Sequence, residues 1–151
     1  MYMKNFKIIF FLFLCFAAVS CSSYKNESIA IKQLLEKESA TWRSGDAIEH
    51  ANCWKIEPYS RILVSTVDGK SFDVPPLAMV QTNPQNMGNG GSSINTNYKI
   101  KISGRNAWVS HDEVSTDKDG TKTYSYEIRI LEKSHNQWKL VSQSIHAYIP
   151  N

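Results

Sequence analysis

Alternating apolar and polar residues dominate the second half of this chain, from about Asn97 to Tyr148. The pattern divides into three strand-like segments at 97–117, 121–133 and 138–149, which the short sequences KDG and SHNQ separate. A side-chain period of two residues is typical of strands that bury one face. We therefore predict an antiparallel meander whose buried face is covered by helices.

Two helices are predicted ahead of this meander. Ser28 can cap the first, which carries a stripe of apolar residues at helical spacing and ends at Gly45. The stripe consists of Ile31, Leu34, Leu35 and Trp42. Asp46 can cap a shorter helix over 47–54, whose inward-facing residues are predicted to be Ile48, Ala51 and either Cys53 or Trp54.

Short elements connect these helices to the meander. Residues 61–74 predict a hairpin of two short strands around an Asp-Gly-Lys turn. Pro75 and Pro76 cannot lie within a central strand but can begin a helix, so a short third helix is predicted over 75–82. Residues 83–95 are rich in Gly, Asn and Ser and predict a long loop, whose role the sequence does not indicate.

The N-terminus predicts export and a lipid anchor. Lys4 and Lys7 precede an apolar run of about a dozen residues, which fits a secretory signal and is too short to span a bilayer as a helix. The run ends in Ala-Val-Ser-Cys at 18–21, which resembles the bacterial lipobox, where cleavage precedes a cysteine that becomes lipid-modified. The predicted organisation is a lipoprotein signal over 1–20, lipidation at Cys21, a polar tether over 21–27 and one domain over 28–151.

This processing predicts a membrane-anchored lipoprotein of the bacterial cell envelope, with the membrane as a partner through Cys21. The alternative is a soluble secreted or periplasmic protein, because Ala18 and Ser20 also suit an ordinary signal cleavage site.

Charge and cysteine usage narrow the chemistry further. The whole chain has 17 basic and 14 acidic residues. Lys4 and Lys7 leave with the predicted signal, so the mature protein is close to neutral and no nucleic-acid partner is predicted. Cys53 is then the one cysteine left for the fold, and we expect a buried structural thiol. The four histidines show no metal-binding spacing, and neither a metal nor a cofactor is predicted.

Several stretches resemble the nuclear transport factor 2-like (NTF2-like) superfamily, including its SnoaL-like members. The sequence IKQLLEKESATWRSGDAIEHANCW at 31–54, followed by Glu57-Pro58-Tyr59, resembles the opening helices of an exported bacterial subgroup. NYKIKISGRNAWVS at 97–110 and EIRILEKSHNQWKLV at 127–141 resemble its strand signatures, although 134–137 depart from the usual acidic-Gly turn. The resemblance implies an α+β fold, a cone in which a strongly curved antiparallel or mixed sheet wraps around N-terminal helices.

Strand parity selects the candidate site. The resemblance favours the faces of Val109 and Trp138 as those that point into the cone, which would gather polar side chains near its mouth. The expected ligand-binding residues are His50, Trp54, Tyr59, His111, Glu113, Glu127, Arg129, His146 and Tyr148. His146, Glu127 and His111 are the catalytic candidates, since a histidine near a carboxylate can act as a general base near neutral pH. The arginine of this set could hold a substrate carboxylate through paired hydrogen bonds.

Three functions stay open at this stage. The first is a non-catalytic ligand-binding or accessory domain that uses the cone cavity for a small apolar or amphipathic molecule. The second is a cofactor-free enzyme of the SnoaL or ketosteroid-isomerase type, with a histidine or an acidic general base. The third is a protein–protein interaction module. Relatives commonly dimerise through the outer sheet face, so the resemblance implies a homodimer. It carries over no catalytic residues, because no stretch matches the isomerase motifs position by position.

Overall fold

The computed structural model describes residues 3–88 and 90–150, and it places side chains from residue 24 onward within these ranges. The chain divides into two compact units at residue 32, and each is described by itself. The side chains of the predicted signal and of Cys21 lie outside the described residues, so the anchor stays a prediction. Within the described part, no helix combines the length and the apolarity that crossing a membrane requires.

Helix α1 extends over Met3–Ser44. Ser28 therefore lies inside this helix and not at its N-terminus, as its predicted capping role would require. The cause is local: residues 21–27 contain neither glycine nor proline, so nothing in that stretch interrupts helical hydrogen bonding. The predicted end of the helix is confirmed, since Gly45 adopts a left-handed backbone with φ of +74°.

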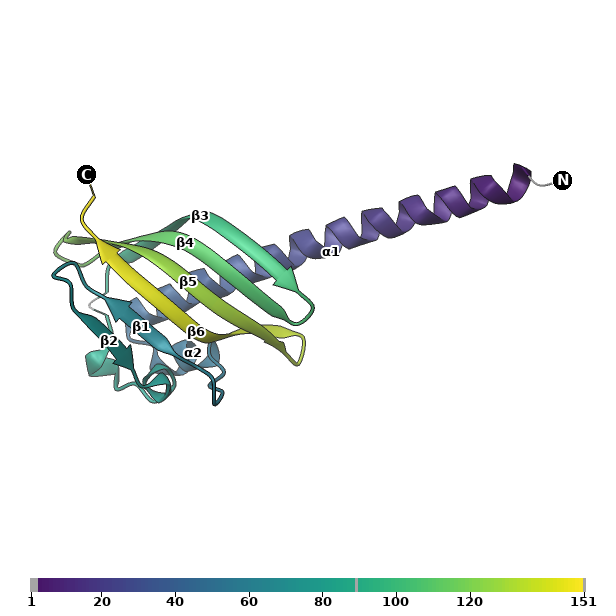
Figure 1. Ribbon diagram of the computed structural model, residues 1–151. Helices are drawn as coiled ribbons and strands as arrows, with labels where there is room; N and C mark the ends of the chain where they lie inside the picture. The colour runs from purple at the N-terminus through teal and green to yellow at the C-terminus, as the bar shows by residue number, and fades with distance from the viewer. Residues whose placement is uncertain (1–2, 89, 151) are drawn as a thin grey trace. The chain divides into compact units, whose positions relative to one another are not determined.

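Six strands of the described residues form one sheet in the order β2-β1-β6-β5-β4-β3 (Figure 1). Strand β1 runs parallel to β6, and every other neighbouring pair is antiparallel, so the sheet is mixed. The last turns of α1 and the short helix α2 lie against one face of the sheet (Figure 1). The strands are β1 (Ile62–Ser65), β2 (Ser71–Val74), β3 (Ser92–Ser103), β4 (Asn106–Thr116), β5 (Lys122–Ser134) and β6 (Gln137–Tyr148).

The meander contains four long strands, and the expectation of three is wrong. The predicted segment at 97–117 is divided by a two-residue turn of Gly104 and Arg105 between β3 and β4. Gly104 has a φ of +59°, which glycine adopts without a steric penalty. The apolar alternation continues on both sides of this turn, so the pattern alone does not show where the chain reverses.

The segment between β2 and β3 is more ordered than predicted. The third helix is present as a single 3₁₀ turn, η1 (Pro76–Met79), and a second 3₁₀ turn, η2 (Pro84–Asn86), lies within the predicted loop. Strand β3 begins at Ser92, which shortens that loop further. Prolines at the first or second position of both turns explain why they begin there.

Helix α2 (Ala47–Asn52) begins as predicted but buries a different residue. The Asp46 side chain accepts a hydrogen bond from the Glu49 backbone N–H at 3.0 Å, which confirms the cap. Ile48, however, is 76% exposed, and His50 is fully buried. The inward position of this helix is therefore polar, and a hydrophobic pattern cannot identify it.

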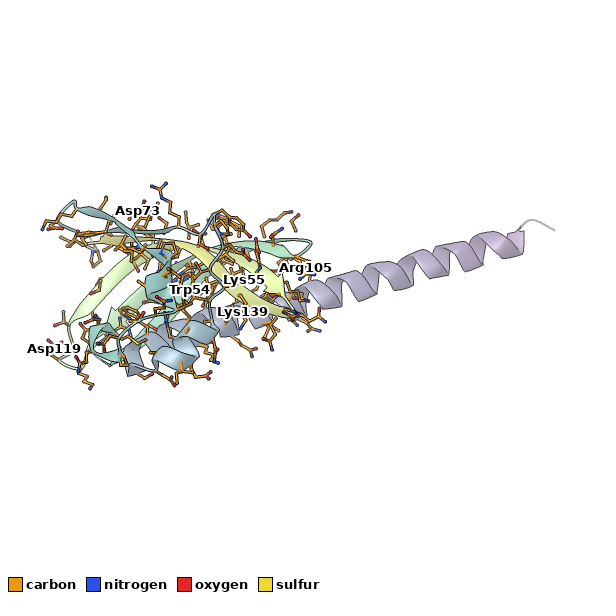
Figure 2. The ribbon with its side chains drawn as sticks, turned by 90° about the horizontal axis from the view of Figure 1, so that it is seen from below. Trp54, Lys55, Asp73, Arg105, Asp119 and Lys139 are labelled. Carbon is orange, nitrogen blue, oxygen red and sulfur yellow. The ribbon has the colours of Figure 1, made fainter. Side chains whose placement is uncertain are left out.

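The apolar core lies towards one end of the strands. Leu35 of α1 packs in the fully buried set, together with Val109, Leu131, Leu140 and Val141 of the sheet. Figure 2 labels Arg105 in the β3–β4 turn and Asp119 in the β4–β5 turn, which mark opposite ends of these strands. Because β5 proceeds from the Asp119 end to Leu131, the apolar core occupies the far half and leaves the near half to other side chains.

Candidate functional site

The inward face of β5 changes from polar to apolar along the strand. Ser125, Glu127 and Arg129 are each less than a tenth exposed, and Leu131 after them is fully buried. Charged side chains at such depth are costly unless they are paired or hydrogen-bonded. Their clustering in one half of the cone is the first sign of a site.

A cavity of about 450 Å³ occupies this half of the cone, within the size range of small-molecule sites. Its polar side comes from α1, α2, β4 and β5 and contains Glu38, Ser39, Arg43, His50, Glu113, Ser115, Thr123, Ser125, Glu127 and Arg129. Its apolar side comes mainly from β1, β2, η1 and β6 and contains Ile62, Val64, Val74, Met79, Ile145 and Ala147. The two sides are largely, not strictly, separate, because Ser65, Thr66 and Gln143 line the cavity beside the apolar residues and Trp42 lines it from α1.

Arg129 connects the polar groups of the deep end. Its Nη2 pairs with Glu127, while its Nη1 donates to the side-chain carbonyl of Gln143 and lies 3.5 Å from Glu38 Oε2. Burial lowers the pKa of this guanidinium, but the carboxylates of Glu127 and Glu38 outweigh burial and raise the pKa above its ordinary value. Both terminal nitrogens already have partners, whereas the buried Nε has none, so a substrate carboxylate at this arginine would compete with Glu127, Glu38 and Gln143.

Glu38 and His50 form a buried pair between α1 and α2. His50 Nε2 lies 3.1 Å from Glu38 Oε1, and its Nδ1 lies 3.0 Å from the carbonyl oxygen of Met79. A carbonyl only accepts, so a hydrogen bond at the Met79 contact places a proton on Nδ1. Burial opposes ionisation of Glu38, but the charge of Arg129 and the hydrogen bond from His50 prevail and lower the pKa of this carboxyl.

The pKa of Glu127 is shifted in the opposite direction to that of Glu38. Burial raises the pKa of its carboxyl group; Arg129 lowers it, while Glu113 and Glu38 raise it further, so the pKa lies above its ordinary value. The Ser125 hydroxyl donates to Glu127 Oε1 at 2.9 Å. A carboxyl group held towards its neutral form can donate a proton or a hydrogen bond inside a cavity.

Glu113 is held by hydroxyl groups. Ser39 Oγ donates to Oε2 at 2.8 Å, and Ser115 Oγ donates to Oε1 at 2.6 Å. Glu113 is only 9% exposed. Among the residues that the structure describes, no lysine, arginine or histidine nitrogen lies within ion-pair distance of this carboxylate.

His111 lies next to this cluster but does not line the cavity. It is 2% exposed, its ring packs against that of Tyr98 with 5.2 Å between centroids, and its Nε2 lies 3.7 Å from Glu127 Oε2. Burial, together with the positive charge of Arg129, lowers the pKa of His111 to about 4. The ring is therefore neutral near pH 7, and its separation from Glu127 is too long for a hydrogen bond.

A β-bulge in β6 changes which residues of that strand face the cavity. The pairing of β5 with β6 shifts between Ile130 and Leu131, where β6 has one residue more than β5. Leu140 and Val141 are consecutive in β6, yet both are fully buried. The alternation beyond the bulge is therefore opposite to the one predicted from Trp138.

His146 and Tyr148 consequently lie on the outer face of the sheet, and the expectation that they point into the cone is wrong. His146 is exposed and pairs across the strands with Tyr126. The rings of Tyr148 and Tyr126 stack with 4.2 Å between centroids. Gln143, Ile145 and Ala147 face the cavity in their place.

Trp54 and Tyr59 also lie away from the cavity. Trp54 is 5% exposed, forms an isolated bridge with Leu140 and packs in the interior between the helices and the sheet (Figure 2). Tyr59 is 62% exposed, and its hydroxyl donates to Glu132 Oε1 at 2.6 Å. Of the expected set, the structure brings His50, Glu113, Glu127 and Arg129 together around the cavity.

Several polar residues of the cavity, among them Glu38, Ser39 and Gln143, were not predicted from the sequence. Glu38 and Ser39 follow the buried Leu35 by three and four positions, which places them on the same helical stripe. That spacing could have identified Glu38 and Ser39 as inward-facing residues. The sequence contains no comparable signal for Gln143, because its inward direction depends on the bulge in β6.

Metal chemistry and thiol chemistry have little support at this site. Within the described part of the chain, no group of three or more histidine, cysteine or acidic side chains could hold a metal ion. Cys53 is a free, buried thiol, as predicted. Its burial, with the negative charge of Glu38, raises the pKa to about 11, so the unreactive thiol form prevails.

A curved mixed sheet that wraps around two helices and leaves a polar cavity at one end defines the class of α+β cone proteins. Neither protein-family models nor curated protein sequences give a match to this chain. Solved structures do. An NTF2-like protein of unknown function from Shewanella baltica is 20% identical, and the alignment covers 84% of this chain and 98% of that one with a TM-score of 0.63.

Two further solved structures have a similar fold. An NTF2-like protein with a cystatin-like fold from Novosphingobium aromaticivorans is 15% identical, with coverage of 85% and 86% and a TM-score of 0.61. An NTF2-like protein of unknown function from Silicibacter pomeroyi is 11% identical, with coverage of 82% and 98% and a TM-score of 0.62. The chain thus has the NTF2-like fold, which confirms the fold that the sequence resemblance implies. Likeness at these identities establishes the fold and leaves activity to the site.

Proposed function

We propose that this protein binds a small amphipathic molecule in the cavity of its cone. The observation that carries the proposal is the division of a 450 Å³ cavity into an apolar side and a polar side of buried, hydrogen-bonded groups. A molecule with an apolar body and one polar end matches both sides at once. Binding sites of this size typically combine apolar walls with a few fixed polar groups.

The open cavity favours this function over that of an interaction module. A cone that only presents its surface to a partner has no need of internal space, and its own tryptophan and leucine side chains can fill it. Here Val109, Leu131 and Leu140 pack the far half, and a cavity remains beside Glu113, Glu127 and Arg129 that a ligand could occupy.

A cavity-filling variant tests the proposal. Neutral amphiphiles such as 2-phenylethanol and octan-1-ol are titrated by calorimetry into the full chain in lipid nanodiscs, with empty nanodiscs as the blank. Ala147 lines the cavity and Ser144 of the same strand does not, so Ala147→Phe and Ser144→Phe form a matched pair. We expect saturable binding to the wild type and to Ser144→Phe, and at least tenfold weaker binding to Ala147→Phe. Absence of saturable binding for the whole panel, or equal binding to all three proteins, would contradict the proposal.

Proton transfer is the second candidate function, and one observation favours it. Glu127, whose pKa is raised, and the Glu38–His50 pair, whose Oε1 and Nε2 atoms lie 3.1 Å apart, line the same cavity. Such a combination of proton donor and acceptor suits cofactor-free acid–base chemistry. Deuterium uptake by a panel of small ketones, followed by NMR, should be faster with the wild type than with Glu127→Gln. Equal rates for both proteins would remove this candidate.

We also propose that Cys21 carries a lipid anchor that holds the protein at the bacterial cell envelope. The support is the short apolar run and the Ala-Val-Ser-Cys sequence that ends it. A binding domain at a membrane surface would meet amphipathic molecules that partition there, which agrees with the polarity of the cavity.

A further inference from the structure

The cationic groups around the cavity are all engaged with carboxylates. The lining contains two arginines and one histidine as its basic side chains. Arg129 pairs with Glu127 and Glu38, and His50 pairs with Glu38. Arg43 pairs with Asp117 at 2.9 Å. An anionic ligand would therefore compete with these existing contacts, although the buried Nε of Arg129 has no hydrogen-bond partner.

Glu113 is the exception among the carboxylates that line the cavity. Its oxygens accept hydrogen bonds from Ser39 and Ser115, and in the described structure no cation stands opposite them. Arg129 acts on Glu113 only at longer range. A buried carboxylate without a direct ion pair is costly, and two hydroxyl donors offset that cost only in part. Each carboxylate oxygen retains a second lone pair for a further donor.

We propose that the polar end of the ligand is a cationic nitrogen, an ammonium group that binds to the Glu113 carboxylate. The inference rests on the proposed function and names the class of ligand for it. The hydroxyl oxygens of Ser39 and Ser115, whose protons point to Glu113, can accept the remaining N–H groups of the ammonium. The apolar body of the ligand then lies on the side of Ile62, Val64 and Ile145.

The balance of charged groups around the whole cavity also supports a cationic ligand. Its lining has three carboxyl groups, from Glu38, Glu113 and Glu127, but only one guanidinium, that of Arg129, pairs with any of them. A monocation adds positive charge where the protein lacks it. A carboxylate ligand would add a fourth acid to the cluster and would find both Nη atoms of the guanidinium occupied.

Three probes of one shape and different charge test the inference. These are 2-phenylethylammonium, 2-phenylethanol and 3-phenylpropionate, titrated by calorimetry into the full chain in nanodiscs. We expect the ammonium to bind at least tenfold more tightly than the alcohol and the carboxylate to bind more weakly than both. Glu113→Gln should abolish the preference for the ammonium over the alcohol, so that the two probes bind with similar affinity.

The control variants distinguish the effect of the Glu113 charge from the effect of the protein's overall charge. Glu36 is exposed on α1 and does not line the cavity, so Glu36→Gln removes the same charge elsewhere and should bind like the wild type. A wild-type circular dichroism spectrum and thermal melt show that Glu113→Gln is folded, and Ser115→Ala should give a smaller loss for the ammonium in the same direction. Equal or tighter binding of 3-phenylpropionate, or an ammonium preference that survives in Glu113→Gln, would overturn the inference while the cavity remains a binding site. Failure of all three probes and of the neutral panel would instead overturn the proposed function itself.

Discussion

Arg129 shows how a single residue can organise a buried site. Its guanidinium contacts acidic side chains from α1 and β5 and an amide from β6, so three elements meet at one planar group. Arginine suits this role because it stays charged and offers donors in several fixed directions. The neighbouring acids differ as a result: the pKa of Glu38 is lowered, and that of Glu127 is raised.

His111 should make folding stability depend on pH. Its pKa falls from 6.5 in the unfolded chain to about 4 in the folded protein, so between these values the unfolded state binds more protons. The stabilisation is fully present above pH 6.5 and is lost as the pH falls towards 4. For the wild type, this residue should contribute a loss of about 2 kcal/mol in the free energy of unfolding between pH 7 and pH 5.

Replacement of His111 by phenylalanine keeps a ring against Tyr98 and removes the titration. Urea unfolding at pH 7 and pH 5 should therefore show a smaller loss of stability for His111→Phe than for the wild type. His146→Gln is the control, because it removes a histidine that is exposed on the outer face. If His111→Phe loses as much stability as the wild type over this range, burial of a neutral His111 is not the cause.

At the scale of elements, the bulge in β6 decides the composition of the site. One additional residue at Val141 lets two consecutive side chains face the core and reverses the alternation of everything after it. Gln143 thereby reaches Arg129, and His146 is turned away. A bulge also increases local twist, which suits a sheet that must curve around helices.

Shortening the side chain of Val141 tests whether β6 contains a bulge or alternates regularly. Val141→Ala removes two fully buried methyl groups and should lower the free energy of unfolding by about 2 kcal/mol. Under strict alternation from Leu140, Val141 would face outward, and the change would cost well under 1 kcal/mol. Val67→Ala, at a residue that is 56% exposed, provides the control in the same urea titrations. A negligible loss for Val141→Ala would contradict the bulge.

The fold was largely predictable, and the reasons are local. Gly45, Asp46 and the alternation of β4 and β5 are strong short-range signals, and each agrees with the structure. The same alternation grouped Glu113 with Val109, and Glu127 with Arg129, and the family resemblance selected these faces as the inward ones, which agrees with the structure.

The remaining errors have physical causes of two kinds. A bulge leaves no mark in a pattern of period two, which is why His146 and Tyr148 were assigned to the wrong face. Burial of a polar residue by hydrogen bonds opposes hydropathy, which is why Ile48 was expected where His50 lies. Both errors fall at or beside the site, where local rules are most often broken.

At the scale of the whole molecule, the outer sheet face is the main exposed apolar surface of the long strands. Trp108, Tyr126 and Ile128 are 40%, 52% and 36% exposed, and Tyr126 stacks on Tyr148. Aromatic side chains are enriched at protein–protein interfaces, and exposed apolar patches often mark them. We expect a homodimer through this face, as the family resemblance implies.

Substitution on this face should separate the subunits. Tyr126→Lys places a charge at the centre of the patch, and sedimentation of the full chain in density-matched detergent should report a monomer where the wild type is a dimer. Phe72→Lys is the control, because Phe72 is 50% exposed on β2, at the far edge of the sheet. A monomeric wild type, or a dimer that survives Tyr126→Lys, would contradict this interface.

The predicted anchor determines where the cavity meets its ligand, and it depends on Cys21. Acyl chains on that cysteine would add about 0.8 kcal/mol of membrane affinity for each buried methylene group. In bacterial cells, the wild type should fractionate with the membrane, and mass spectrometry should find lipid on its N-terminal peptide. Cys21→Ser should lose the modification and shift towards the soluble fraction, while Cys15→Ser, within the predicted signal, should behave like the wild type. If Cys21→Ser partitions as the wild type does, the cysteine is not the anchor, and the amphipathic ligand must then reach the cavity from the aqueous phase.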